Sequence, residues 1–163
     1  MRFDRRILRP LSAATLAGIA CAAVVIGLPA PASAQADQTL VLKATRMEDT
    51  ASAAPKLGDA FVIDEDLTDE SGKPAGTAAV DCKVTGLSED TPPHAYSNCD
   101  VTLELSGGAL FLTCHAKHEL GSTEGQPCAV IGGTRDYKLA RGEGTVSLPD
   151  KKTVLYKVDV SMS

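Results

Sequence analysis

Apolar and polar residues alternate along most of the chain after residue 37. Successive side chains of a strand point to opposite faces, so a period of two predicts strands with one apolar face. Helical spacing is scarcely present, and the pattern is that of an all-β protein. Eight strands are expected, at about residues 40–44, 61–67, 78–84, 99–105, 110–114, 128–131, 140–148 and 153–160.

The turns between these segments favour one arrangement. Gly58-Asp59 and the run Asp69–Pro74 supply turn residues on either side of the second strand. Short antiparallel strands with one apolar side suit a closed eight-stranded antiparallel β-barrel, because closure removes the unpaired edges of a flat sheet. A two-sheet sandwich is the alternative. On the seventh strand, the small residues Ala140, Gly142 and Gly144 would leave space inside a barrel or ease strong bending.

The composition indicates one folded domain. Of 163 residues, 44% are hydrophobic and 23% are charged, whereas only 4% are aromatic and Trp is absent. These proportions argue against intrinsic disorder and predict a modest aliphatic core.

The first 34 residues have the pattern of a secretory signal peptide. Its removal would leave residues 35–163 as the barrel domain. Four arginines precede the apolar run Leu11–Leu28, and Ala32-Ser33-Ala34 matches a cleavage site. No later stretch is apolar for the ~20 residues that a membrane span requires. We therefore expect a secreted protein without membrane contact after cleavage.

Other interpretations of this segment stay open. Cleavage after Ala36 would change only the first residues of the mature chain. The Arg5-Arg6 pair matches a twin-arginine signal in part, and Cys21 could carry a lipid. A retained membrane anchor is disfavoured by the helix-breaking, cleavable end of the segment.

Charge limits the choice of partner. The segment carries four Arg and one Asp, so its removal takes the net charge from −5 to −8 with His neutral. Nucleic acid is not expected as a partner, because phosphate binding needs a cationic face.

Four cysteines remain after Cys21 leaves with the signal, namely Cys82, Cys99, Cys114 and Cys128. An even number in an oxidising compartment predicts two disulfides, with three possible connectivities. The pairs Cys82–Cys99 and Cys114–Cys128 need only neighbouring strands. Free thiols are the alternative, and a zinc site is disfavoured because no Cys-x-x-Cys occurs.

A tight hairpin between the fourth and fifth strands supports these pairs. Gly107-Gly108 is expected to close it and to pair Ser106 with Ala109. This register places Cys99 opposite Ala116, so a bridge from Cys99 to the fifth-strand cysteine is less natural.

Two stretches, residues 57–76 and 129–142, resemble secreted actinobacterial-type members of the allene oxide cyclase and dirigent superfamily. The first has a Gly-Asp, aromatic, Asp, Gly-Lys and Gly pattern before Cys82, and the second reads Ala-Val-Ile-Gly-Gly-Thr-Arg-Asp-Tyr-Lys-Leu-Ala-Arg-Gly. The resemblance implies an eight-stranded barrel with a ligand cavity, often a homotrimer. Plant members cyclise a fatty-acid epoxide or guide phenoxy-radical coupling without a cofactor, so none is expected here.

The resemblance does not extend to the catalytic groups of the plant cyclases. Their catalytic Glu and water-holding Asn correspond to Ala44 and Arg46, and a pocket Tyr falls on or near Lys117. A second pocket Asn corresponds to Glu65, and the pocket Cys to Cys82. True allene oxide cyclase activity is therefore not expected.

Glu65 is the candidate catalytic residue, and Glu65 with Arg46 the candidate ligand-binding pair. Glu65 alternates with Phe61 and Ile63, so a regular strand points its carboxyl into the barrel, where burial would raise its pKa for acid–base work. Arg46 shares the face of Leu40 and would pair with Glu65 or hold an anionic ligand. The alternatives are a solvated strand end for Glu65 and a surface position for Arg46.

No metal site is expected. His115 and His118 project to opposite sides of a strand, and the acidic run at residues 64–70 lacks the spacing of a calcium loop. Tyr137 and Arg141 of the second stretch are expected to stabilise a turn.

Two classes of function follow. The first is a secreted barrel that binds a small apolar molecule or acts on it as a cofactor-free cyclase or isomerase. The second is a non-enzymatic extracellular structural or interaction module whose barrel is filled by its own side chains. The sequence leaves open whether the protein is an enzyme.

Overall fold

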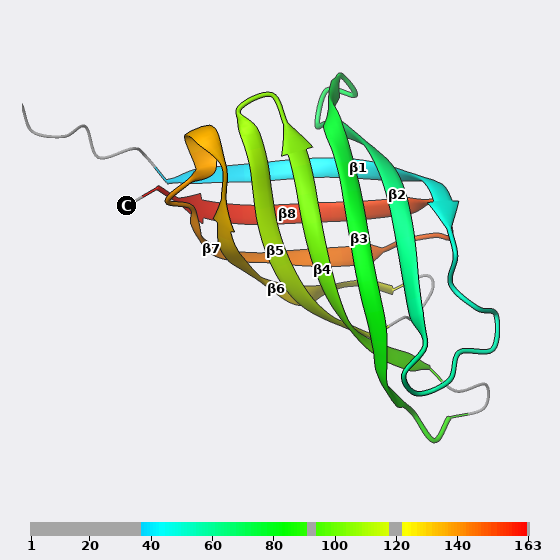
Figure 1. Ribbon diagram of the computed structural model, residues 1–163. Coiled ribbons are helices and arrows are strands. Elements are labelled where there is room, and N and C mark those ends of the chain that lie inside the picture. Colours follow the sequence, from blue (N-terminus) through cyan, green and yellow to red (C-terminus); the bar gives the residue numbers. More distant parts are fainter. Residues whose placement is uncertain (1–36, 91–93, 118–121, 163) are drawn as a thin grey trace, which may run out of the picture. The chain divides into compact units, whose positions relative to one another are not determined.

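The computed structural model describes residues 37–90, 94–117 and 122–162; the predicted signal peptide, residues 1–34, and His118 lie outside them. Eight antiparallel strands form one closed barrel in sequence order, with β1 beside β8 (Figure 1), so the predicted fold class is confirmed. The sandwich alternative is wrong, because β1 pairs with β8 over most of its length. The strands are β1 Gln38–Asp49, β2 Ala60–Asp69, β3 Pro74–Leu87, β4 Ala95–Leu105, β5 Gly108–Lys117, β6 Ser122–Gly133, β7 Arg141–Leu148 and β8 Thr153–Ser161.

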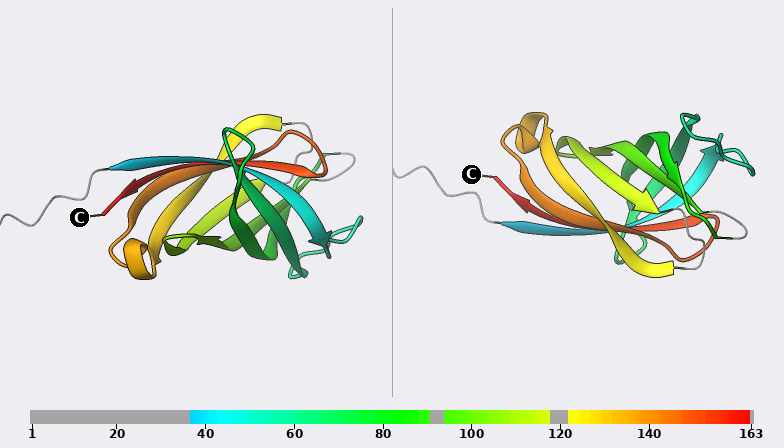
Figure 2. Two further views of the ribbon diagram at one scale, coloured as in Figure 1. Left: turned by 90° about the horizontal axis from the view of Figure 1, so that it is seen from above. Right: turned by 90° about the horizontal axis from the view of Figure 1, so that it is seen from below.

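Buried and exposed residues alternate along the strands of the barrel. In β2, every second side chain from Phe61 to Leu67 is buried, and β8 repeats this pattern from Val154 to Val160. The alternation thus sends one apolar row of each strand inward, as the period of two predicts. The sheet curls until the last strand returns to the first, as seen from above and below in Figure 2. In the described part of the chain, no helix is long and apolar enough to cross a membrane.

The two ends of the barrel differ in their filling. At the end where η1, the short 3-10 helix Arg135–Tyr137, lies between β6 and β7, fully buried side chains fill the interior. They include Leu67, Leu103, Leu110, Val158 and Val160. The other end, where β1 ends at Asp49 and β8 begins at Thr153, is called the mouth below.

The second stretch of the family resemblance forms the turn around η1. Tyr137 is 8% exposed and packs with the core, and Arg141 Nη1 donates a hydrogen bond of 2.6 Å to the carbonyl of Ala140. Tyr137 is thus part of the packed core, and Arg141 contacts the backbone where the turn ends.

The predicted hairpin is wrong: its turn lies one residue earlier, which shifts the pairing of β4 with β5 by two residues. Leu105 pairs with Gly108, so the turn consists of Ser106 and Gly107 instead of Gly107-Gly108. Gly108 has φ of 131°, and a Cβ there would lie within 2.5 Å of the Thr134 carbonyl oxygen. Gly108 is thus a strand residue that permits a close approach of the η1 turn.

This shift changes the environment of the cysteines. Cys99 lies opposite Cys114 instead of opposite Ala116. The disulfides join Cys82 to Cys99 and Cys114 to Cys128, the pairs expected from neighbouring strands.

The seventh strand also differs from its prediction. Ala140 lies before β7 and is fully buried. Gly142 has φ of 148°, and a Cβ there would overlap the carbonyl oxygen of Asp159 on β8. At Gly144 a Cβ would lie 2.8 Å from the carbonyl oxygen of Lys157. These glycines let β7 and β8 approach closely, and they do not create internal space.

Candidate functional site

A small cavity lies inside the barrel near the mouth. Its volume is about 30 Å³, which is room for one or two water molecules. Most of its walls are aliphatic or cystine side chains, and three lining residues carry polar groups: Arg46, Glu65 and Tyr156. The cavity is therefore an apolar space with one polar side.

Glu65 projects into this interior from the middle of β2. Glu65 is only 2% exposed, and its Oε2 accepts a hydrogen bond of 2.7 Å from Tyr156 Oη. On one side of β1, Glu65 of β2 lies opposite Arg46. On the other side, Tyr156 of β8 lies opposite Leu42, which is four residues before Arg46 on the same inward face of β1. The hydrogen bond thus links β2 and β8 across β1.

Ala44 makes this contact possible. In the register it lies between Leu42 and Arg46 on the inward face of β1, and it is fully buried. A methyl side chain at that position leaves room for the Tyr156 ring and the Glu65 carboxyl to meet above it.

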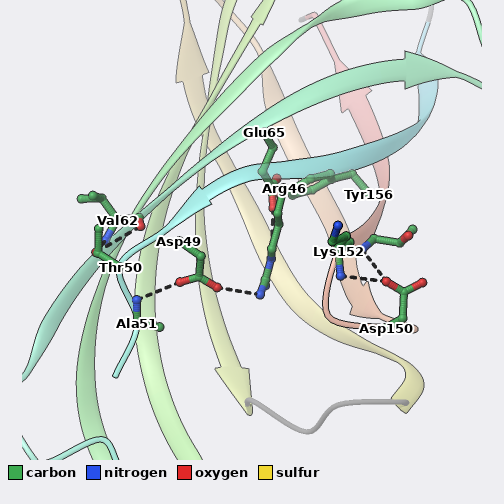
Figure 3. A network of polar contacts seen from close by, with 10 residues as sticks. Arg46, Asp49, Thr50, Ala51, Val62, Glu65, Asp150, Lys152 and Tyr156 are labelled. Atoms are coloured by element: carbon green, nitrogen blue, oxygen red, sulfur yellow. Dashed lines mark hydrogen bonds and ion pairs between the residues drawn. The ribbon is translucent and has the colours of Figure 1, made fainter. Parts of the chain in front are cut away.

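Arg46 closes the polar side toward the mouth. Its side chain is 13% exposed, and its Nη1 lies 3.1 Å from Asp49 Oδ2, an ion pair drawn as a dashed line in Figure 3. Its Nε lies 3.7 Å from Glu65 Oε1, which is an ion-pair distance and too long for a hydrogen bond. Among the described residues this buried Nε has no hydrogen-bond partner.

Burial changes the proton affinity of both acids. It raises the pKa of Glu65 above the ordinary value of 4.5, although the Tyr156 hydrogen bond and the Arg46 charge act in the opposite direction. Burial also raises the pKa of Tyr156 well above 10, and the nearby Glu65 carboxylate adds to this. Tyr156 is therefore a hydrogen-bond donor at neutral pH, and Glu65 is poised to exchange a proton.

The arrangement can serve a ligand in two ways. The unpartnered Arg46 Nε–H can donate to an acidic or polar oxygen, and Glu65 can give or take a proton beside it. Reaching both groups requires the Arg46 side chain to swing outward, since the present cavity accommodates only water.

The structure brings Arg46 and Glu65 together, whereas Tyr156 was missed by the sequence analysis. The alternation of β8 marks Tyr156 as an inward residue, but nothing in the sequence pairs residues 91 positions apart. In the described residues, no group of three or more His, Cys, Asp or Glu side chains is placed to hold a metal ion.

No known protein family matches the sequence, and no curated protein matches it. Several solved structures, in contrast, match the fold of this chain. A pyocyanin demethylase is 24% identical, with a TM-score of 0.62 over 76% of this chain and 100% of that one. An exo-specific intermolecular Diels–Alderase is 14% identical, with a TM-score of 0.58 over 77% and 98%. A pterocarpan synthase dirigent protein is 18% identical, with a TM-score of 0.57 over 78% and 96%.

These similarities establish the fold. The chain is a β-barrel of the kind seen in dirigent proteins and Diels–Alderases, in agreement with the barrel implied by the family resemblance.

Proposed function

We propose that this protein is a secreted barrel that binds a small, largely apolar molecule by one acidic or polar end at the mouth. The observation that carries the proposal is the Arg46–Glu65–Tyr156 cluster. A buried carboxyl, a buried phenol and a guanidinium whose Nε makes no hydrogen bond among the described residues lie at one side of an aliphatic interior. Folding alone favours apolar residues there, because burying polar groups is costly unless they are fully paired.

The polar end of the ligand would take the place of Asp49 beside Arg46. The Arg46–Asp49 pair is partly exposed, with Asp49 side-chain exposure of 31%, so solvent screening makes it weak and replaceable. The apolar body of the ligand would then lie against the Val and Ile residues of the cavity wall.

The reaction class that fits this site is cofactor-free proton transfer. With its pKa raised by burial, Glu65 can hold a proton closer to neutral pH than an exposed carboxyl does, and it can pass that proton to or from a bound ligand. This is the chemistry of an isomerase or cyclase. The similar demethylase and Diels–Alderase barrels support catalysis inside this fold.

Thermal unfolding with paired ligands tests the binding site. Benzoate-type carboxylates should raise the Tm more than the matching neutral amides do, because only the carboxylates add a charge attraction to Arg46. At about 100 Kd the gain in unfolding free energy is about 2.7 kcal/mol. Arg46→Gln should abolish the difference between carboxylate and amide. Asp66→Asn, which removes an outward carboxylate from the same strand as Glu65, should leave it unchanged.

Native mass spectrometry of the protein from a secreting host gives the second test. A molecule that co-purifies with the wild type and is absent from the Glu65→Gln variant would support the proposal. Chemical conversion of that molecule during incubation with the wild type would show that the protein is an enzyme. No bound molecule, together with equal Tm values for carboxylates and amides, would contradict the proposal.

The competing function is a filled barrel that acts as an extracellular structural or interaction module. The specific observation in its favour is the cavity volume of about 30 Å³. In that case Arg46→Gln and Glu65→Gln would alter stability and leave every ligand titration flat.

A further inference from the structure

The four cysteines form a single row across four neighbouring strands. In the register, Cys82 lies opposite Cys99, Cys99 opposite Cys114, and Cys114 opposite Cys128. All four are between 1% and 6% exposed. The two disulfides close the β3–β4 and β5–β6 steps of this row, and the β4–β5 step between them carries no bridge.

The unbridged step has a strand spacing that a disulfide can span. Opposed residues in antiparallel sheets alternate between close pairs, about 4.5 Å between Cα atoms, and wide pairs of about 5.5 Å. Each existing bridge spans a Cα–Cα distance of 4.1 Å, a close pair, so Cys99 and Cys114 stand in a wide pair. A distance of about 5.5 Å lies within the usual Cα–Cα range for disulfides, so the spacing of β4 and β5 permits a Cys99–Cys114 bridge.

We propose that this row is a thiol–disulfide exchange relay, in which opening one bridge lets the other move to Cys99–Cys114. A small dithiol first reduces Cys82–Cys99 to two thiols and is itself oxidised to a disulfide. The Cys99 thiolate then attacks Cys114 Sγ: the Cys99–Cys114 bond forms and the Cys114–Cys128 bond breaks. The electron pair leaves on Cys128 Sγ, which takes up a proton, so the second step needs no further reductant.

The relay would move a thiol between two environments. Cys82, Cys99 and Cys114 line the internal cavity together with Glu65. Cys128, the thiol that the second step releases, lines instead a groove that also includes Cys114 and the exposed residues His115 and Glu143. Reduction on one side thereby releases a thiol on the other. The inference depends only on the register and is independent of ligand binding at the mouth.

Two double variants test the geometry. Cys82→Ser/Cys128→Ser keeps only Cys99 and Cys114, and after air oxidation its free thiols should fall from two to none. Cys82→Ser/Cys114→Ser is the matched control. It keeps Cys99 and Cys128, which lie two strand spacings or about 10 Å apart, so both thiols should react with iodoacetamide once the oxidised sample is unfolded in guanidinium. A folded first variant that retains two reactive thiols would overturn the proposal.

Partial reduction of the wild-type protein tests the same step without relying on a variant that folds. Limiting dithiothreitol at neutral pH, followed by acid quenching, alkylation and peptide mapping, should yield a Cys99–Cys114 peptide with Cys82 and Cys128 alkylated. Reduction by a phosphine at acid pH should not, because exchange requires a thiolate. Half-reduced protein at neutral pH that contains only the two original bridges would overturn the relay.

Discussion

At the scale of single residues, Glu65 decides the electrostatics of the barrel. Its carboxyl is buried between Tyr156 and Arg46, and burial is the largest cause of its raised pKa. The folded protein thus binds the Glu65 proton more tightly than the unfolded chain does. The stabilisation that this proton provides is complete below about pH 4.5 and is lost as the pH rises through the raised pKa.

Glu65→Gln should remove this pH dependence, because Gln keeps the shape without an ionisable proton. The free energy of unfolding of the wild type should fall relative to Glu65→Gln between pH 4.5 and neutral pH, as measured by urea unfolding at a series of pH values. Asp69 and Asp150, whose pKa values are lowered by hydrogen bonds, occur in both proteins and cancel in the difference. If the difference in unfolding free energy between the wild type and Glu65→Gln stays constant with pH, the pKa of Glu65 is not raised by folding. Asp66→Asn, which removes an exposed carboxylate from the same strand, controls for the change in charge.

At the scale of elements, close strand contacts depend on glycines. Gly142 on β7 combines φ of 148° with a position where a Cβ would overlap the β8 backbone. Neighbouring strands pair along their whole length only if no side chain intervenes at this point.

Gly142→Ala should therefore destabilise the barrel by about 1–3 kcal/mol, measured by chemical denaturation. The matched control is Gly72→Ala in the β2–β3 turn, where φ is 81° but no atom lies within 4 Å of an added Cβ. The control should cost less, since it adds backbone strain without a clash. Equal losses in the two variants would refute the close-approach role of Gly142.

At the scale of the whole molecule, the outer face bears apolar side chains. Val41 on β1 and Leu155 on β8 are 38% and 42% exposed, and the register makes them diagonal neighbours, with Val41 opposite Lys157 and Leu155 opposite Lys43. Such a pair on adjacent strands can contribute to an interface between copies.

We expect a homotrimer, as the family resemblance implies, and light scattering at micromolar concentration should give three times the chain mass. Val41→Lys should reduce this mass, because an unpaired charge is costly in an interface. Val62→Lys, an exposed position on β2, serves as the control. A monomer mass for the wild type would reject the trimer and leave the barrel unchanged.

The sequence by itself determined the all-β class and the inward row of most strands, and it favoured a barrel over the sandwich that the β1–β8 pairing rules out. Alternation acts through local geometry, because each residue's face follows from its neighbours along the chain. It therefore marked Glu65 and Arg46 as inward residues and paired cysteines on neighbouring strands.

Only the tertiary structure decided what meets across the barrel. The Tyr156–Glu65 hydrogen bond joins strands that are not neighbours, and it crosses β1, where the small residue Ala44 lies between Leu42 and Arg46. The hairpin turns at Ser106-Gly107, where Gly108 comes close to the carbonyl of Thr134, and this register places Cys99 opposite Cys114. Register and cavity volume depend on packing between distant segments, which local alternation does not encode.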